Sequence, residues 1–287
     1  MTNSGKHQHR AVLKRVAHQA MLEKGLAPDF SKPALAQLEK ITGPAPCTEP
    51  SMRDLRSRIW CSLDNDDSRD LDQLTVAEVL PDGATTVWVA IADVDAIVKR
   101  ATPLDDHAQQ NTTSVYTVAE LFPMLPTKLS TNFTSLNEDE DRLAMVVEMT
   151  FTEDGSLRSS DLYPAIVRNH AKLAYNNVAL WLNGSEPIQS AIIPGLEENL
   201  RLQDHMAQKL KALRHLQGAL DLETIHARPI FIGDELKDLE SEKQNRAKEI
   251  IEEFMIATNG VTARFLATKN QVSLRRVVRI PKRWDQI

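Results

Sequence analysis

The sequence predicts an α+β protein in which a mixed, mostly antiparallel sheet packs with long helices, preceded by a small N-terminal helical arm. Three observations predict this class. Apolar β-rich runs occupy residues 52–167, amphipathic helical spacing dominates the second half, and Gly43-Pro44-Ala45-Pro46 sets both apart from two short helical segments. The chain has 287 residues, of which 42% are hydrophobic and 26% charged, so it is long enough to bury a sizeable core.

The N-terminal arm is predicted over residues 1–45. Residues 11–24 carry apolar side chains at helical spacing opposite a basic face, and Gly25 follows as a helix end. A second helix is predicted after Ser31, with Pro33 in its first turn. Two such helices are too small to be stable alone. We interpret them as an arm packed on the larger domain, with a small RNA- or protein-contacting module as the alternative.

Residues 46–287 are predicted to form the main domain. Its main predicted strands are residues 85–94, 142–151 and 157–167, the first central and the last two joined by a turn at Glu153-Asp154-Gly155. Its predicted long helices are residues 196–216 and 240–269. Residues 116–126 lie between the first two strands, and within them Pro123-Met124-Leu125-Pro126 is predicted to form a rigid loop.

Charge and cysteine content limit the classes of function. The net charge is −6, but both ends of the chain are basic and the centre is acidic. That distribution is typical of a protein whose basic segments bind phosphates and whose carboxylates bind metal. It is equally well explained by charges at the termini that only increase solubility. Cys47 and Cys61 have no metal-binding spacing, so a disulfide framework and a zinc site are not expected. Without an apolar membrane span or signal peptide, a cytoplasmic protein is expected.

Five aspartates crowd into the nine residues 64–72, between two β-rich runs, 58–61 and 74–77. Two carboxylates about 4 Å apart repel by roughly 1 kcal/mol in water and by several times more where water is scarce. An oxygen-preferring divalent cation such as Mg²⁺ is the usual way to neutralise such a cluster.

Three interpretations of this acidic stretch compete. A solvated loop is the commonest explanation of an acidic run. A calcium loop of the EF-hand type is rejected, because Arg69 stands where glycine is needed and Thr75 where a bidentate glutamate is needed. A two-metal nuclease site, in which close aspartates hold two Mg²⁺ ions across a phosphodiester, is the third.

Six motifs decide between these interpretations. The segment beginning Arg53-Asp54-Leu55 and running through the acidic stretch resembles the opening of the catalytic RNB domain in the ribonuclease II/ribonuclease R family. Five further segments resemble motifs of the same family in the same order: Ala90-Ile91-Ala92-Asp93-Val94, Thr113-Ser114-Val115-Tyr116 with Phe122-Pro123-Met124-Leu125-Pro126, Ser135-Leu136-Asn137 with Asp141-Arg142-Leu143-Ala144-Met145, Ala171-Lys172-Leu173-Ala174-Tyr175, and Ile251 to Asn259. Together they span about 236 residues, which favours the two-metal interpretation.

The resemblance implies a hydrolase that degrades single-stranded RNA from its 3′ end to nucleoside 5′-monophosphates, using Mg²⁺. Asp64, Asp70 and Asp72 match catalytic, metal-coordinating carboxylates of the family. One or two Mg²⁺ ions are expected, with Mn²⁺ as a substitute, because carboxylates suit hard cations. No haem, flavin, nucleotide cofactor or membrane is expected, and the protein is expected to be a monomer.

The resemblance also implies RNA-binding residues. Tyr175 matches a tyrosine that stacks on a base near the 3′ end, and stacking accepts any base. Tyr116 is a second candidate for lining the RNA path. Glu252 and Glu253 occupy the position of a sugar-contacting glutamate, but they lie about 100° apart on a helix and cannot both face one site. Asp93 lies in an apolar run, where a structural hydrogen-bonding role is expected rather than a metal role.

Two departures from the family pattern leave an alternative open. Gln73 stands where the family commonly has a fourth aspartate, and a neutral amide is a poorer Mg²⁺ ligand. The chain also stops at a stretch, 281–284, that in the family lies inside the catalytic domain, so we expect a domain lacking its C-terminal part. The alternatives are therefore an inactive or impaired RNB-like RNA-binding protein or fragment, or a chain that does not fold stably by itself.

Overall fold

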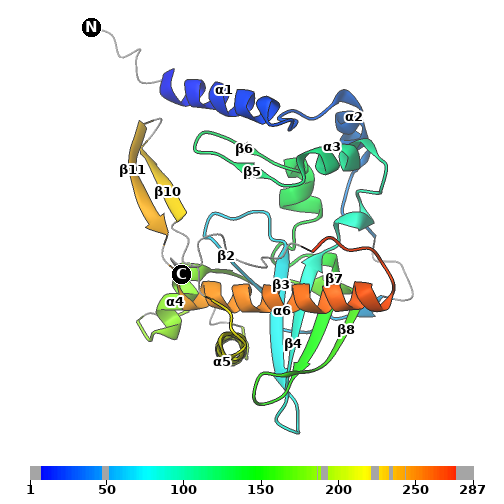
Figure 1. The fold of residues 1–287 in the computed structure, drawn as a ribbon, viewed down its shortest axis with the longest axis vertical. Helices are drawn as coiled ribbons and strands as arrows, with labels where there is room; N and C mark the ends of the chain where they lie inside the picture. Colours follow the sequence, from blue (N-terminus) through cyan, green and yellow to red (C-terminus); the bar gives the residue numbers. More distant parts are fainter. Residues whose placement is uncertain are drawn as a thin grey trace.

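A computed structural model of the protein describes residues 8–46, 52–185, 187–188, 193–220, 226–232, 235–242 and 244–275 (Figure 1). The α-helices are α1 (Gln8–Glu23), α2 (Lys32–Lys40), α3 (Pro103–Asn111), α4 (Tyr175–Leu182), α5 (Leu196–Leu216) and α6 (Arg246–Thr268). The strands are β1 (Arg53–Asp54), β2 (Cys61–Asp64), β3 (Gln73–Val79), β4 (Thr85–Ala92), β5 (Val115–Tyr116), β6 (Leu121–Phe122), β7 (Asp141–Phe151), β8 (Leu157–Arg168), β9 (Ala171–Ala174), β10 (His226–Ile232) and β11 (Glu235–Glu242). Two short helical turns are η1 (Val94–Ala96) and η2 (Leu129–Phe133).

Seven of the strands form one sheet in the order β1-β8-β7-β4-β3-β2-β9. The four inner pairings, from β8 to β2, are antiparallel, whereas β1 and β9 add to the two ends in parallel. The predicted mixed, mostly antiparallel sheet is therefore confirmed, and so is the central place of the strand predicted over residues 85–94. The turn at Gly155, where φ is +85°, joins β7 to β8 as predicted.

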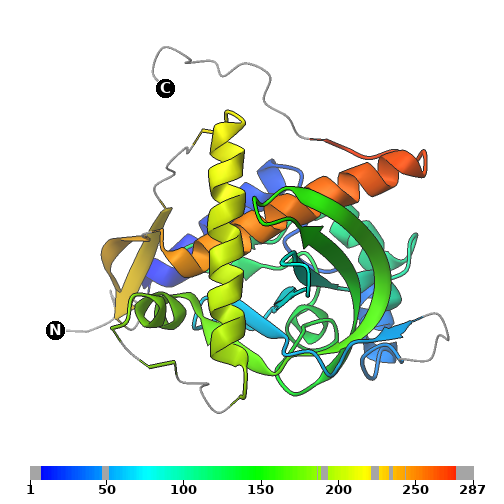
Figure 2. The ribbon, with the colours of Figure 1, turned by 90° about the horizontal axis from the view of Figure 1, so that it is seen from below.

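Both faces of the central strand are buried, which explains why its sequence is continuously apolar. Side chains alternate across a strand. Val87 and Val89 face a core cluster shared with the long helices, while Trp88 and Ala90 face a second cluster on the opposite side of the sheet. The curved sheet thus packs against helices on one face (Figure 2). On the other face, aromatic and aliphatic side chains form the second cluster.

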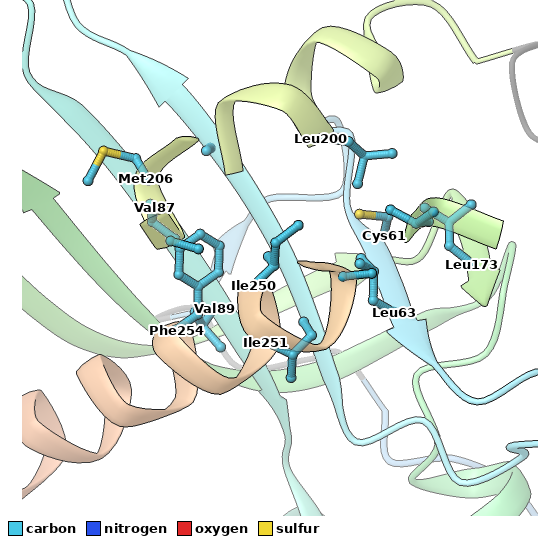
Figure 3. Close-up of a cluster of buried hydrophobic side chains, with 14 of the residues drawn as sticks. Cys61, Leu63, Val87, Val89, Leu173, Leu200, Met206, Ile250, Ile251 and Phe254 are labelled. Carbon is cyan, nitrogen blue, oxygen red and sulfur yellow. The ribbon is translucent and has the colours of Figure 1, made fainter. Parts of the chain in front are cut away.

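The helices α5 and α6 contact one another and cover one face of the sheet (Figures 1 and 2). Their buried side chains, among them Leu200, Ile250 and Phe254, meet Val87, Val89 and the β2 side chains in the larger core cluster (Figure 3). Within the described ranges, no helix combines the length and the apolar character that a membrane crossing requires.

The N-terminal helices rest on residues 94–133 of the main domain. Ser31 caps α2 by accepting a hydrogen bond from the Ala34 amide, and Gly25 follows α1 with a φ of +76°. Ala34 lies fully buried in a small cluster with side chains of α3 and η2. The predicted domain boundary at 45/46 stays a prediction, since residues 47–51 lie outside the described ranges.

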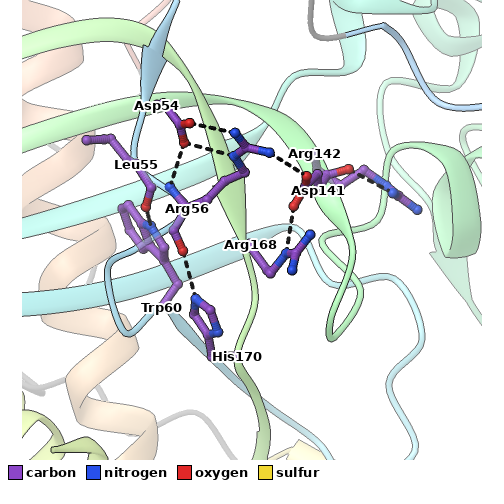
Figure 4. A network of polar contacts seen from close by, with 8 residues as sticks. All are labelled: Asp54, Leu55, Arg56, Trp60, Asp141, Arg142, Arg168 and His170. Carbon is purple, nitrogen blue, oxygen red and sulfur yellow. Dashed lines mark hydrogen bonds and ion pairs between the residues drawn. The ribbon is translucent and has the colours of Figure 1, made fainter.

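An ion-pair network ties the start of the main domain to the sheet (Figure 4). Arg56 forms a bidentate pair with Asp54, at 2.9 and 2.6 Å, and also donates to Asp141 at 2.9 Å. Arg168 donates to the other oxygen of Asp141 at 2.7 Å. Asp54, Arg56 and Arg168, together with His170, border an open hollow of about 480 Å³. Since two arginines face two aspartates, the network balances its own charge.

The structure corrects the predicted helix over residues 240–269. Glu240 lies on β11, which pairs with β10 in an antiparallel hairpin that periodicity did not predict. The helix α6 begins only after Asn245, whose side chain accepts the Lys248 amide hydrogen and so satisfies an open donor of the first turn. Residues 123–126, predicted as a rigid loop, lie in neither a helix nor a strand, and the small hairpin β5–β6 just before them was not predicted.

Near the acidic stretch, two strand boundaries in the structure differ from the predicted ones. The strand predicted over residues 58–61 begins only at Cys61, because the Trp60 amide bonds to the Arg58 carbonyl in a turn. Asp93 lies just beyond β4 rather than inside a strand, and its carboxylate accepts the Ala96 amide hydrogen at the start of η1. The expected structural role of Asp93 is confirmed.

We predict that Phe254→Ala lowers the free energy of unfolding by about 3–5 kcal/mol, because Phe254 is fully buried between α6 and the sheet. Ile256→Ala on the same helix is the matched control, since Ile256 is 41% exposed and should cost less than about 1 kcal/mol. Urea denaturation measures both. An equal decrease in the free energy of unfolding in the two variants would contradict the place of Phe254 in the core.

Candidate active site

The acidic loop, residues 64–72, joins the ends of two neighbouring antiparallel strands. Asp64 is the last residue of β2, and β3 begins at Gln73. The Asp64 carboxylate folds back on its own loop, accepting the Asn65 amide at 2.7 Å and the Ser68 hydroxyl at 2.9 Å. Asp64 and Asp70 are half-buried, while the Asp72 side chain is exposed.

Asp72 is the most perturbed carboxylate of the loop. Although its side chain reaches solvent, protein surrounds it closely enough that partial desolvation, together with the negative charges of Asp64 and Asp70, raises its pKa from 3.8 to about 6. The three predicted carboxylates therefore lie within electrostatic reach of one another. A cluster that resists ionisation in this way favours a bound cation.

Tyr116 reaches the same loop from the β5–β6 hairpin. Its hydroxyl donates to Asp70 at 3.2 Å, and its ring is 70% exposed. Desolvation and the charge of Asp70 raise the pKa of Tyr116. The helix α1 lies along this hairpin, where Lys14 pairs with Glu120 (Figure 1). The structure thus brings Tyr116 into contact with Asp70, while its place along an RNA path stays a prediction.

Strand register brings Tyr175 beside Asp64. The strands β2 and β9 run in parallel with Asp64 opposite Ala174, and Tyr175 is the next residue, at the start of α4. Lys172, two residues before Ala174, donates from its ammonium group to the Ser68 carbonyl at 2.6 Å. One short strand therefore supplies both an aromatic ring and a cation next to the acidic loop.

The two glutamates of α6 point in different directions. Glu253 is only 3% exposed and pairs with Arg214 of α5 at 2.6 Å. It is therefore engaged within the interface between the two helices, so of the two alternatives the exposed Glu252 is the one that is open to a ligand. Glu252 is exposed and accepts from Gln244 at 2.8 Å. The predicted contact with RNA stays a prediction for Glu252.

Gln73 does not join the acidic group. Its side chain is nearly buried, and its amide nitrogen lies 3.3 Å from the Leu63 carbonyl oxygen, as a donor within the sheet. The departure from the family pattern thus replaces a possible ligand by a side chain that is used structurally.

The chemistry of the donor set fits a hard divalent cation. Asp64, Asp70 and Asp72 offer carboxylate oxygens, which Mg²⁺ prefers, and the raised pKa of Asp72 reports their uncompensated charge. In the described part of the chain, however, no three carboxylate, histidine or cysteine side chains converge closely enough to enclose an ion. Like charges push such side chains apart, so closure around an ion requires rotation of the aspartates.

Sequence reasoning missed the residues that hold the acidic loop. The Ser135 hydroxyl and the Leu136 amide, both from the Ser-Leu-Asn motif, bond to the loop backbone at Arg69 and Leu71. The recurrence of this motif was the available signal, but spacing alone could not reveal that residues 66 positions apart meet in the fold.

Comparison with known proteins places this site in a family. Residues 52–286 match the RNB domain. The chain belongs to the RNB domain family. It is 36% identical to ribonuclease R of Vibrio parahaemolyticus over 229 residues, which is 79% of this chain and 27% of that protein. It is 35% identical to ribonuclease R of Escherichia coli, over 78% of this chain and 28% of that protein.

Solved structures show the same fold. Mycoplasma genitalium RNase R in complex with ribose methylated single-stranded RNA matches with a TM-score of 0.80 and 22% identity, over 94% of this chain and 41% of that one. Yeast Ssd1, a pseudonuclease, matches with a TM-score of 0.62 and 14% identity, over 79% of this chain and 28% of that one. This RNB domain chain spans less than a third of the length of the Vibrio and Escherichia ribonuclease R relatives.

We predict that Asp72→Asn makes the protein more stable above pH 6 when a chelator is present. The folded-state pKa of Asp72, about 6, exceeds its ordinary 3.8, so the folded state holds the proton more tightly and ionisation favours unfolding. Stability is lost as the pH rises from about 4 to about 6. The difference in Tm between variant and wild type should therefore be positive at pH 7.5 and vanish near pH 4.

Asp154→Asn is the control with the opposite sign. Hydrogen bonds from Thr152 and Ser156 lower the pKa of Asp154, so its ionisation contributes stability that is lost as the pH falls. This variant should be less stable than wild type at pH 7.5. A Tm difference for Asp72→Asn that is negative, or the same at both pH values, would contradict the assigned electrostatics.

Proposed function

We propose that this RNB domain is the catalytic part of a Mg²⁺-dependent hydrolytic exoribonuclease that degrades single-stranded RNA from the 3′ end to nucleoside 5′-monophosphates. The observation that carries the proposal is that Asp64, Asp70 and Asp72 lie within electrostatic reach of one another where the acidic loop joins β2 to β3, with Tyr175 next in register. Ribonuclease R relatives at 35–36% identity support the reaction class.

In this proposal the three aspartates hold Mg²⁺, singly or as a pair of ions, and Mn²⁺ can replace it. Bound Mg²⁺ would supply activation of the attacking water and charge stabilisation at the leaving 3′-oxygen. Asp72, whose pKa of about 6 lies just below neutrality, ionises most readily when a cation offsets Asp64 and Asp70. Tyr116 holds Asp70 through its hydroxyl, so Asp70 must exchange this bond when it turns toward an ion.

RNA recognition is assigned to the aromatic side chains beside the acidic loop. Tyr175 stacks on a base near the 3′ end, and the exposed ring of Tyr116 offers a second stacking surface. Glu252 contacts a ribose hydroxyl, which would distinguish RNA from DNA. Stacking reads no base identity, which suits an enzyme that moves along a strand. The buried thiol of Cys61, which forms no disulfide, fits a monomer acting in the reducing cytoplasm.

A second candidate is an RNA-binding relative without turnover. Gln73 favours it, because a neutral amide occupies the place of a fourth carboxylate and bonds to Leu63 instead. The likeness in fold to a pseudonuclease is compatible with either candidate, since fold alone does not carry activity. Both candidates bind RNA more weakly as salt increases, so only turnover separates them.

A time course with single-stranded RNA tests the proposal. The chain is incubated with 5′-labelled or 3′-labelled RNA, in Mg²⁺ or in chelator, and products are resolved by length. We expect metal-dependent release of mononucleotides from the 3′ end, abolished by Asp72→Asn while RNA binding in chelator is retained. RNA binding without any product would favour the second candidate. Internal cuts, or activity that survives Asp72→Asn, would overturn the assigned roles.

Tyr175→Ala is predicted to weaken binding of single-stranded RNA by about 1–3 kcal/mol, or roughly 5- to 150-fold in Kd, because it removes a stacking surface. Tyr175→Phe, which keeps the ring, should stay near the wild-type value. Fluorescence anisotropy in chelator measures both. Equal losses in the two variants would indicate a hydroxyl contact instead of stacking.

A further inference from the structure

The backbone of the acidic loop is anchored on both sides of Asp70 by one side chain. The Ser135 hydroxyl accepts the Leu71 amide hydrogen at 3.0 Å. Its own proton has two acceptors within reach, the Arg69 carbonyl oxygen at 3.0 Å and the Asn137 side-chain oxygen at 2.9 Å. The Leu71 amide and the Arg69 carbonyl belong to the two peptide units that flank Asp70. Ser135 is only 2% exposed, so water does not compete for these bonds.

The next two peptide units of the acidic loop are also held by hydrogen bonds, in this case from backbone amides. The Leu136 amide donates to the Leu71 carbonyl at 2.8 Å, and the Ala92 amide donates to the Asp72 carbonyl at 3.0 Å. Every peptide unit from Asp70 to Gln73 is therefore bonded to a residue outside the loop. Ser135 alone acts through a side chain, so its hydroxyl can be removed without changing the backbone.

The segment that carries Ser135 is held in place without that hydroxyl. Leu136 is 1% exposed and packs in the core cluster beneath the sheet. Its carbonyl accepts from the buried Asn169 side chain at 3.0 Å, and Asn169 also bonds to Ser62 of β2. Loss of the Ser135 hydroxyl removes its contacts with the acidic loop and with the Asn137 side chain. The packing and hydrogen bond of Leu136 should still hold the backbone of this segment in place.

We propose that Ser135 is a positioning residue that fixes Asp70 relative to Asp72 and thereby sets the affinity of the acidic loop for divalent cations. The inference rests on the metal-binding role proposed above. Two like charges in one short loop tend to separate, whereas Mg²⁺ demands a near-ideal octahedral arrangement of its ligands. A backbone locked on both sides of Asp70 restricts the movement of its carboxylate to side-chain rotation.

The test compares Ser135→Ala with Thr134→Val. Thr134 is the neighbouring buried residue, and its hydroxyl donates to the Leu129 carbonyl at 3.0 Å, away from the loop. Calorimetric titration with Mg²⁺ is the main readout, and RNA binding in chelator shows that the fold is intact. We expect Mg²⁺ affinity to fall about 10- to 100-fold in Ser135→Ala, as for other residues that orient metal ligands, and to be unchanged in Thr134→Val.

Ser135→Cys is a second variant that keeps the volume of the side chain but hydrogen-bonds poorly, so it serves if the alanine variant unfolds. It should lose Mg²⁺ affinity as well, and the turnover of both variants should recover at high Mg²⁺. If folded Ser135→Ala or Ser135→Cys bound Mg²⁺ with wild-type affinity, the role of Ser135 would be overturned, but the proposed function would not. Absence of Mg²⁺ binding and of turnover in the wild-type chain would instead overturn the proposed function on which it rests.

Discussion

Repulsion among Asp64, Asp70 and Asp72 is the constraint on which the candidate site depends. Partial desolvation, together with the negative charges of Asp64 and Asp70, raises the pKa of Asp72 to about 6, so the ionised cluster disfavours the folded state at neutral pH unless something compensates. Hydrogen bonds to the backbone of the acidic loop hold it in place against this repulsion. Asp64 ends a buried strand, and each peptide unit after Asp70 is bonded to Ser135, Leu136 or Ala92. Such a strained cluster is a feature of sites selected for function rather than for stability.

The sequence motifs divide into those that form the site and those that hold it. Tyr175 and Lys172 lie next to the acidic loop because β9 pairs in register with β2. Asp54 and Asp141, by contrast, belong to the ion-pair network at the edge formed by β1 and β8, and serve the scaffold (Figure 4). A motif shared with a family therefore does not identify a catalytic residue until the fold shows what its side chain touches.

Much of the fold could be predicted from the sequence where local pattern and tertiary burial agree. The apolar run of β4 and the amphipathic period of α5 gave the central strand and a helix with the observed bounds, 196–216. Prediction failed at β10–β11, where pairing between strands overrode a helical pattern through Glu240. At the site, residue types predicted the carboxylates, but not the buried state of Glu253 or the hydroxyl of Ser135. Those depend on contacts between residues far apart in sequence, which no local pattern encodes.

The central claim is that Asp64, Asp70 and Asp72 together bind a divalent cation. Anomalous diffraction from crystals of the wild-type chain grown with Mn²⁺ tests it most directly, because it locates the ion without relying on turnover. We predict an anomalous peak coordinated by carboxylate oxygens of these three residues, absent in Asp72→Asn crystals. A peak elsewhere, or ordered acidic loops without a peak, would contradict the account.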